Sequence, residues 1–387
     1  MKLAKNLERL GTESAFKILA DAKKLESEGR KIIHLSLGQP DFKSPDHVVK
    51  ATKKALDDGH HGYVLPNGII ECREAVTRKI KKLYNLDIDP ERVIIMPGGK
   101  PTMYYAITLF GEPGAEIIYP DPGFPIYESM INYTGAKAVP INMLESNDFS
   151  INPEKILSLI NNNTRLLILN NPNNPTGAFT DKNKIDQLAE GLKKFPHVAI
   201  LSDEIYSRQI FDEKKMPTFF NYPELYDRLI VLDGWSKAYS MTGWRLGWSV
   251  WPESLIEHVI KFCVNNHSCV NAAIQYGAIA ALDGPDDTIN LMMEKFTKRR
   301  KLIYEGLNDI KGVECVMPGG GFYAFPKVIG TGMNGKEFAK KCLHDAGVAI
   351  VPGTAFGKKA TDYVRFSFAA SQDNISKALE NIKKIIE

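Results

Sequence analysis

One lysine in the sequence has surroundings that suit chemistry better than solvation. Lys237 follows Ser236 in the stretch DGWSKAYSMTGWRLGW, residues 233–248, which is crowded with aromatic and small side chains. The nearest charged residue downstream is Arg245, about two helical turns further along. A positively charged and partly desolvated environment lowers the pKa of a lysine, so that its amine can act as a nucleophile or a base. Lys237 is therefore a candidate catalytic residue.

Polar side chains follow several apolar runs that read as strands. Asp203 and Tyr206, in SDEIY, come after the run at 198–201. The segment NNPNNPTG follows the run at 166–169, and its Asn-Pro steps could hold an asparagine amide at a fixed angle, although a rigid turn has the same signature. A carboxylate at a strand end is costly unless it is paired. Because ligands bind at the carboxyl ends of the strands in such sheets, we expect these groups to share one site.

A glycine pair opens another helix after the run at 93–96. Gly98, Gly99 and Lys100 would expose backbone N–H groups at the helix N-terminus, which together with the helix dipole favours an anion. The segment is not a P-loop, because the first glycine of that motif is missing and Pro101 follows the lysine. Taken alone, the signal fits a plain tight turn equally well.

Together these groups match the needs of one cofactor. Pyridoxal phosphate requires a lysine for its Schiff base, a carboxylate that keeps its ring nitrogen protonated, a phenol or amide for its 3-oxygen, and a phosphate cradle. Lys237, Asp203 and Tyr206 supply the first three, and Ser236 and Arg245 lie near the fourth. A lysine that must form a Schiff base should not be paired with a carboxylate that locks it protonated, which explains the neighbours of Lys237.

The elements that must position these groups alternate along the middle of the chain. Short apolar runs are continuous rather than alternating in polarity, as expected of strands buried on both faces of a parallel sheet. They lie at residues 93–96, 116–119, 166–169, 198–201 and 229–232. Helical stretches such as 102–110 and 182–194 separate them, which predicts βαβ units. The expected fold class is therefore α/β, with a large domain at 45–284 built on a mostly parallel sheet flanked by helices.

The last part of the chain has a different character. Residues 285–387 predict a smaller α+β domain, and residues 1–44 read as an N-terminal arm and helix that join it. The expected elements are a helix at 292–310, short strands near 321–325, 348–351 and 363–368, and a closing helix at 373–386.

Length, composition and charge narrow the class of protein. The chain has 387 residues, 44% of them hydrophobic and 25% charged, as in an ordinary soluble globular protein of about two domains. Its net charge of +3 and the lack of a basic cluster interleaved with aromatics argue against a nucleic-acid partner. The start, MKLAKNLERL, does not resemble a signal peptide, and no apolar run approaches the ~20 residues that span a bilayer. We therefore expect a cytoplasmic protein that does not bind membranes.

The cysteines and histidines predict no metal site. The five cysteines are scattered and form no CxxC motif, which favours reduced thiols in a cytoplasmic interior. The eight histidines show no convincing ligand spacing.

The motifs resemble those of the fold-type I pyridoxal-phosphate aminotransferases of class I and II, the aspartate aminotransferase family, over essentially the whole chain. SKAYSMTGWRLGW resembles the Schiff-base motif of that family, and GQPDF, NNPNNPTG, SDEIY and YVRFSF occur in family order and at family spacing. This resemblance implies that Lys237 forms the Schiff base, that Asp203 pairs with the ring nitrogen, and that Tyr206 and Asn174 hold the 3-oxygen. It implies a phosphate site formed by Gly98, Gly99, Lys100, Ser236 and Arg245.

The resemblance also implies the substrate contacts. Along residues 363–368, the period of two places Arg365 on the face opposite its apolar neighbours. A surface salt bridge would explain this, but the resemblance makes Arg365 the bidentate clamp on the substrate α-carboxylate. Gly38, in SLGQPDF, resembles the arm glycine that lies over that carboxylate, and Asn174 contacts the substrate as well. Phe124, in DPGFPIY, lies where the family stacks an aromatic ring against the cofactor, with a core phenylalanine as the alternative.

One further position implies an assembly. Tyr63, in HGYVLPNGI, resembles the tyrosine that reaches the phosphate of the neighbouring subunit. The resemblance therefore implies a homodimer with shared active sites.

The reaction implied is transamination between an L-amino acid and a 2-keto acid in two half-reactions, with ping-pong kinetics. A C–S β-lyase, or another enzyme of this fold type, stays open because it would share the lysine, the aspartate and the arginine. A transcription regulator would need an added DNA-binding segment, and the chain starts directly with the arm. Lys100 resembles a lysine that some bacterial aspartate aminotransferases direct at a distal carboxylate, but Glu13 and Phe16 in the arm depart from their pattern. Aromatic, neutral and basic substrates therefore stay open beside acidic ones.

Overall fold

A seven-stranded sheet forms the centre of the computed structural model, which describes residues 1–212 and 215–387 apart from the side chains of residues 14–16. The strand order is β2-β8-β7-β6-β5-β3-β4. Within the described residues, β8 is the one strand of this sheet that runs in the opposite direction to all the others. The strands are β2 (Val93–Met96), β3 (Glu116–Asp121), β4 (Lys137–Asn142), β5 (Thr164–Asn170), β6 (Ala199–Asp203), β7 (Leu229–Asp233) and β8 (Gly247–Val250). The predicted α/β class with a mostly parallel sheet is confirmed.

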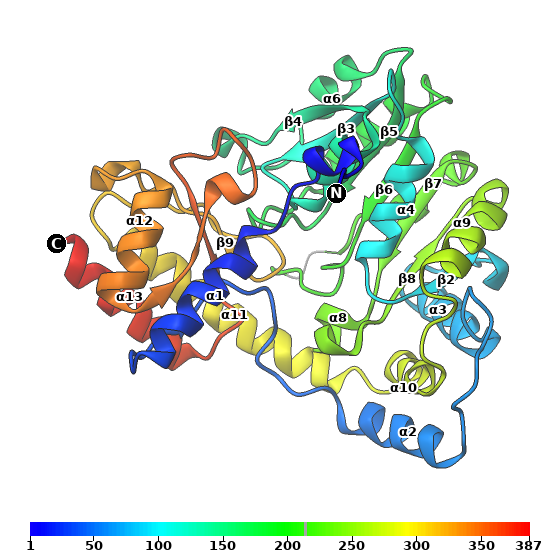
Figure 1. Cartoon of the computed structure of the whole chain (residues 1–387), viewed down its shortest axis with the longest axis horizontal. Helices are drawn as coiled ribbons and strands as arrows, with labels where there is room; N and C mark the ends of the chain where they lie inside the picture. The colour runs from blue at the N-terminus through cyan, green and yellow to red at the C-terminus, as the bar shows by residue number, and fades with distance from the viewer. Residues whose placement is uncertain (213–214) are drawn as a thin grey trace.

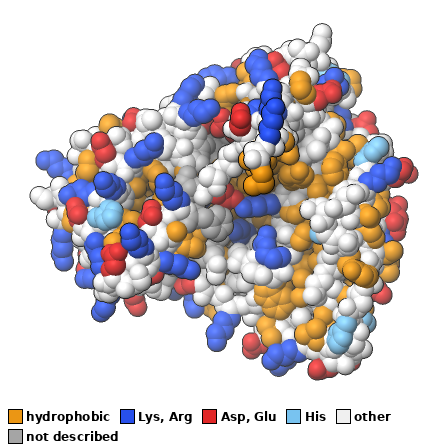
Figure 2. All heavy atoms as spheres, in the orientation of Figure 1, with side chains coloured by type: hydrophobic (Ala, Val, Ile, Leu, Met, Phe, Trp, Pro, Cys, Tyr) orange, Lys and Arg blue, Asp and Glu red, His pale blue; other side chains and the backbone are white. Residues whose placement is uncertain are grey.

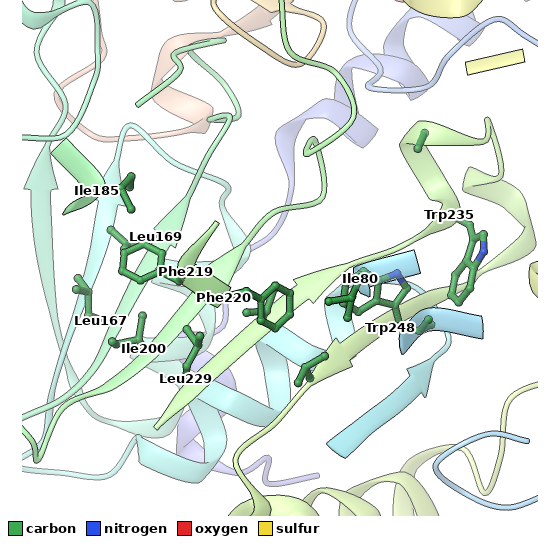
Figure 3. Packing of buried hydrophobic residues seen from close by; sticks show 14 of the residues in the cluster. Ile80, Leu167, Leu169, Ile185, Ile200, Phe219, Phe220, Leu229, Trp235 and Trp248 are labelled. Carbon is green, nitrogen blue, oxygen red and sulfur yellow. The ribbon is translucent and has the colours of Figure 1, made fainter. Parts of the chain in front are cut away.

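Helices cover both faces of this sheet (Figure 1). Neighbouring strand residues point to opposite faces, so that Leu167 and Ile200 lie in one apolar cluster while Ile168 and Leu201 lie in another. Figure 3 shows part of the first cluster, which includes the phenylalanine pair Phe219 and Phe220. Burial on both faces explains why the strands read as continuous apolar runs. The first cluster includes side chains of α3 (Ile70–Tyr84), α7 (Lys182–Leu192) and α10 (Ala272–Asp283), and the second those of α4 (Lys100–Phe110), α5 (Ile126–Thr134) and α9 (Glu253–Asn266).

The C-terminal part has a core of its own. A three-stranded antiparallel sheet in the order β11-β12-β9 packs with long helices around buried side chains such as Phe296, Phe322 and Phe366. The N-terminal segment joins this part, because the first strand pairs in parallel with β10. These elements are α1 (Ser14–Ser27), β1 (Ile33–His34), α11 (Asp287–Asn308), β9 (Tyr323–Ala324), α12 (Gly335–Lys341), β10 (Val348–Ala349), β11 (Val351–Pro352), β12 (Val364–Ser367) and α13 (Gln372–Ile386). The domain boundaries at residues 44 and 284 stay a prediction.

Most of the predicted elements agree with the observed ones to within two residues, but the single strand predicted at 348–351 is divided between β10 and β11, which belong to different sheets, and α11 begins five residues before the predicted 292. The five predicted strands of the large sheet correspond to β2, β3, β5, β6 and β7, whereas β4 and β8 were not predicted. The remaining helices of the large part are α2 (Asp46–Asp57), α6 (Pro153–Leu159) and α8 (Trp235–Ala238). Within the described ranges, no helix combines the length and the apolar character needed to cross a bilayer.

Candidate active site

A cavity of about 510 Å³ lies where the carboxyl ends of the sheet strands face the C-terminal part. Figure 2 shows this hollow between the two parts of the molecule, with lysine and arginine side chains gathered inside it. Asp203 and Asn170 reach the cavity from the ends of β6 and β5, and Lys237 reaches it from α8, which follows β7. Arg365 reaches it from β12 on the opposite side. The site is therefore assembled from segments far apart in the sequence.

Lys237 lies in this cavity as a half-buried side chain. Its Nζ donates a hydrogen bond to the carbonyl oxygen of Gly38 at 2.6 Å, and it lies 5.9 Å from the ring centroid of Tyr206 and 5.7 Å from that of Phe322. Burial lowers the pKa of Lys237 to about 8, and the positive charges of Arg365 and Arg245 act in the same direction. At pH 7 about a tenth of such amines are neutral, compared with fewer than about one in a thousand for a lysine at its ordinary pKa.

Asp203 is the buried carboxylate of the site. The phenol of Tyr127 donates to its Oδ2 at 2.5 Å, and the backbone N–H of Ile205 donates to its Oδ1 at 3.2 Å. Burial raises the pKa of Asp203 to about 6, while the hydrogen bond from Tyr127 holds it down. The group is therefore mostly ionised at neutral pH. A buried anion of this kind suits a cationic ligand atom such as a protonated ring nitrogen.

Two backbone turns and an arginine form a cradle at one end of the cavity. Gly98 has a φ of +95°, and a Cβ atom there would lie 2.3 Å from Nη2 of Arg245, so that only glycine lets the guanidinium approach. Nη1 of Arg245 donates to the carbonyl of Thr242 at 2.7 Å. Gly99 precedes the first turn of α4, and Ser236 lies in the lining opposite. Backbone N–H groups, a hydroxyl and a guanidinium form a donor set suited to a phosphate.

Arg365 lies at the other end of the cavity with part of its guanidinium unsatisfied. Its Nη1 donates to Oδ1 of Asn174 at 2.9 Å, and its Nη2 donates to the carbonyl of Ser36 at 2.5 Å. Among the described residues no carboxylate pairs with it, and its buried Nε has no hydrogen-bond partner. The ring centroids of Tyr323 and Phe356 each lie 4.5 Å from its Cζ, and the two rings hold the fork in one orientation. A carboxylate ligand would complete its hydrogen bonds.

Two phenols and an asparagine lie between these ends. The hydroxyl of Tyr206 lies 3.0 Å from that of Tyr323, and burial raises the pKa of Tyr206 well above its ordinary value, so that the phenol stays protonated. Asn170 accepts from the backbone N–H of Asn174 at 2.9 Å and donates to the carbonyl of Asp203 at 3.1 Å. Asn170 therefore orients Asn174, the asparagine that was predicted from the sequence.

The structure brings most of the predicted site residues together. Gly98 lies directly behind the cradle, against Arg245. Those that line the cavity are Gly38, Gly99, Lys100, Phe124, Asn174, Asp203, Tyr206, Ser236, Lys237, Arg245 and Arg365. Tyr63 does not join them, because it is 92% exposed on the loop between α2 and α3. Glu13 lines the cavity as well, while the side chain of Phe16 lies outside the described part of the chain.

Sequence reasoning missed several residues of the site. Tyr127, which holds Asp203, lies three positions after Phe124 at the start of α5, and helical spacing offered a weak signal for it. Tyr323 and Phe356, which flank Arg365, come from the C-terminal part and carried no motif that set them apart.

The groups that this chain places in the cavity fit pyridoxal phosphate. The cavity holds an amine of lowered pKa, an ionised carboxylate, phenol and amide groups, and a glycine cradle that a single Cβ would block. Among the described residues no three His, Cys, Asp or Glu side chains gather as a metal site.

Comparisons with known proteins agree with this arrangement. The family model described as "Aminotransferase class I and II" matches residues 30–382. The chain is 34% identical over 396 residues to the aspartate aminotransferase of Bacillus subtilis, covering 100% of this chain and 99% of that protein. It is 33% identical to aromatic-amino-acid aminotransferase 2 of Thermococcus litoralis, at 100% and 99% coverage. The crystal structure of the aspartate aminotransferase of Rhizobium meliloti superposes with a TM-score of 0.95 at 32% identity, covering 100% of this chain and 99% of that one.

Proposed function

The chain belongs to the class I and II aminotransferases, and from that premise we propose how the residues of its cavity carry out the reaction. The protein is a pyridoxal-phosphate-dependent aminotransferase, which moves an amino group between an L-amino acid and a 2-keto acid in two half-reactions. The observation that carries the assignment of residues is the cavity amine of Lys237, with its lowered pKa, in the same cavity as the ionised Asp203.

The residues that would hold the cofactor fall into two groups, one at its ring and one at its phosphate. Pyridoxal phosphate, when bound, supplies an aldehyde that captures amines and a ring that accepts the electron pair of a broken Cα–H bond. Asp203 would keep the ring nitrogen protonated, and Tyr206 with Asn174 would donate to the ring oxygen. Phe124 would lie against the ring face. The phosphate would be held by Gly98, Gly99, Ser236 and Arg245, and by the backbone N–H of Lys100 at the start of α4, because the Nζ of Lys100 donates to Glu13.

Lys237 moves the proton in this proposal. Its Nζ would take the proton from the substrate Cα and deliver it to the carbon of the cofactor's aldehyde group, and the second half-reaction would run this transfer in reverse. A pKa of about 8 suits both directions of transfer, because the amine is neither locked in its protonated form nor too weak a base at neutral pH. The carbonyl of Gly38 holds Nζ in position at 2.6 Å. The surrounding rings of Tyr206 and Phe322 limit the access of water.

Arg365 and Asn174 bind the α-carboxylate that all amino and keto acid substrates share. The guanidinium already has two of its donors engaged, and its unsatisfied Nε lies in the same plane as the fork. Gly38 would lie beside the carboxylate, because it borders both Lys237 and Tyr323. Clamping the carboxylate fixes the Cα–H bond relative to Lys237, which gives the proton transfer its geometry.

We expect Arg365→Ala to raise the KM for amino acid and keto acid together by at least about 30-fold, since losing one partner of a buried charged pair costs about 2 kcal/mol or more. Single-turnover titration of each half-reaction would measure this. Arg365→Lys keeps the charge but loses the fork, so its KM values should lie between those of the wild type and the alanine variant. Unchanged KM values for both substrates would show that the α-carboxylate binds elsewhere.

The test of the proposed function is a panel of amino acids given to the loaded enzyme. Each accepted amino acid should change the absorption of the bound cofactor and release its 2-keto acid, and a second keto acid should restore the spectrum. Mass spectrometry of the products separates transamination from β-elimination, which would release ammonia and pyruvate from a cysteine conjugate. Release of these products without amino transfer would contradict the proposal.

A homodimer with shared active sites is also proposed. Tyr63, Leu65 and Ile70 are 92%, 56% and 37% exposed in one short stretch, which leaves apolar surface available for a second copy. Tyr63 would then reach the phosphate of the neighbouring site. We expect Tyr63→Phe to weaken binding of the cofactor while sedimentation still shows a dimer. A fully active preparation that sediments as a monomer would contradict this assignment.

We propose a cytoplasmic location because the thiols of the chain are free. All five cysteines are free, and four of them are buried in apolar surroundings. Free buried thiols suit a reducing compartment. Fractionation of the native host would test this location.

A further inference from the structure

Two charged side chains of the cavity have no assigned role in the steps that all substrates share. Lys237, Asp203 and Arg365 are assigned to the proton, the ring and the α-carboxylate. Glu13 and Lys100 also line the cavity, and they bind each other, because Nζ of Lys100 donates a hydrogen bond to Oε1 of Glu13. The pair is partly shielded, with relative side-chain exposures of 15% for Glu13 and 43% for Lys100.

The N-terminal segment is fastened so that Glu13 reaches this position. Arg9 donates to the carbonyls of Asn132 and Tyr133, at 2.7 and 3.0 Å, at the end of α5. The backbone N–H of Gly11 donates to Oγ of Ser129 at 2.9 Å. In Figure 1 this segment, drawn in dark blue, runs from α1 toward the large sheet. These contacts fix the chain directly before Glu13, and the Nζ of Lys100 holds its carboxylate.

The charge of Glu13 acts on the groups that would hold the substrate. Burial lowers the pKa of Arg365 and of Lys237, and the Glu13 carboxylate opposes this at both residues. Lys100 lies at the start of α4 with its Nζ 5.6 Å from the ring centroid of Phe124. A substrate held by Arg365 with its Cα near Lys237 would direct its side chain into the remaining lining, which includes the Glu13–Lys100 pair.

We infer that the Glu13–Lys100 pair makes the side-chain pocket select amino acids with uncharged side chains and 2-keto acids with a single carboxylate. A second carboxylate on the substrate would have to displace Glu13 from Lys100 or lie beside it as a like charge. A cationic side chain would meet the reverse problem with Lys100. Both half-reactions use the same cavity, so the restriction applies to donor and acceptor alike. The inference rests on the proposed function and names its substrate class.

The decisive variant is Glu13→Gln, which removes the anion and leaves Lys100 to receive a second carboxylate. The readout is binding of unreactive acids to the loaded enzyme, with butyrate and succinate as a pair matched in length. We expect the wild type to bind butyrate at least as tightly as succinate. In Glu13→Gln the affinity ratio of succinate to butyrate should rise at least about tenfold, because relief of like-charge repulsion is worth that much or more.

The half-reactions should change in the same direction. Norvaline and glutamate are matched in length and differ in the terminal carboxylate, so the ratio of their single-turnover rates should shift toward glutamate in Glu13→Gln. Adding Lys100→Met to that variant should remove the gain, because the cation that receives the second carboxylate is then absent.

A matched control lies elsewhere in the chain. Glu116 pairs with Lys137 at 2.8 Å, with relative side-chain exposures of 12% and 70%, and it lies outside the cavity. Glu116→Gln should therefore leave the succinate to butyrate ratio unchanged.

Two outcomes would overturn the inference. The first is an unchanged affinity ratio in Glu13→Gln with the half-reactions intact, and the second is a wild type that already binds succinate more than about tenfold tighter than butyrate. Failure of the proposed function would look different, since no amino acid of either kind would then alter the cofactor spectrum of the wild type.

Discussion

Lys237→Ala should abolish transamination and remove the cofactor absorbance that borohydride reduction would fix to the protein. The loss in kcat should be at least about 10⁴-fold, because one substitution removes both the covalent anchor and the proton carrier. Its Nζ is the cavity amine whose pKa is lowered to about 8. Rapid-mixing absorbance with a good substrate would measure the rate. Reduction followed by peptide mapping would locate the modified lysine.

Lys100 provides the control for this experiment. It lines the same cavity, but its Nζ is engaged in an ion pair with Glu13. Lys100→Ala should therefore retain a reducible absorbance, with the label at Lys237. A reducible absorbance that persists in Lys237→Ala would show that another amine captures the cofactor.

The second large effect is expected for Asp203→Asn, which keeps the shape of the side chain and removes its charge. A carboxylate about 4 Å from a ring cation, at an effective dielectric of about 20, is worth roughly 4 kcal/mol. Losing it would lower the pKa of the ring nitrogen by about 3, so we expect kcat to fall about 10³-fold while part of the cofactor stays bound. Half-reaction rates, together with the bound-cofactor spectrum, would measure both quantities.

Glu204 is a matched control because it is the next residue and is equally buried. Burial raises its pKa to about 8, so it is mostly protonated at pH 7. Its Oε1 accepts from Ser202, Thr218 and the backbone of Phe219, contacts that an amide oxygen can keep. Glu204→Gln should therefore stay near wild-type turnover. Equal losses in both variants would show that any change in this buried pair is harmful, and normal turnover in Asp203→Asn would exclude its role at the ring.

The sheet was predictable where its strands are buried on both faces. β5 and β6 contain continuous apolar runs, and turn residues follow each of them. β4 was not predicted because it is an edge strand with an exposed Lys137, half-exposed residues and Pro140 within it. β8 was not predicted because it has only four residues, begins with Gly247, and directly follows the aromatic stretch that contains Lys237.

The site was predictable where one short motif supplies both the residue and its place at a strand end. Lys237 and Asp203 satisfy this condition. Tyr127 and Tyr323 do not, because their contacts depend on how α5 and the C-terminal part pack against the sheet. The sequence indicated that Arg365 needs a partner, but only the folded chain shows that Asn174 and the Ser36 carbonyl fill this place. The pairing of Glu13 with Lys100 likewise depends on the path of the N-terminal segment.

The contact between Arg365 and Ser36 joins residues that lie 329 positions apart in the chain, and β1 pairs with β10 over a similar span. During synthesis the large sheet can therefore be complete, with its lysine and aspartate in place, before the ribosome has made the residue that grips the substrate. The growing chain cannot bind a substrate through Arg365 until its last segment has emerged from the ribosome. A chain that ended before Arg365 would contain every strand of the large sheet but would lack the guanidinium that binds the α-carboxylate.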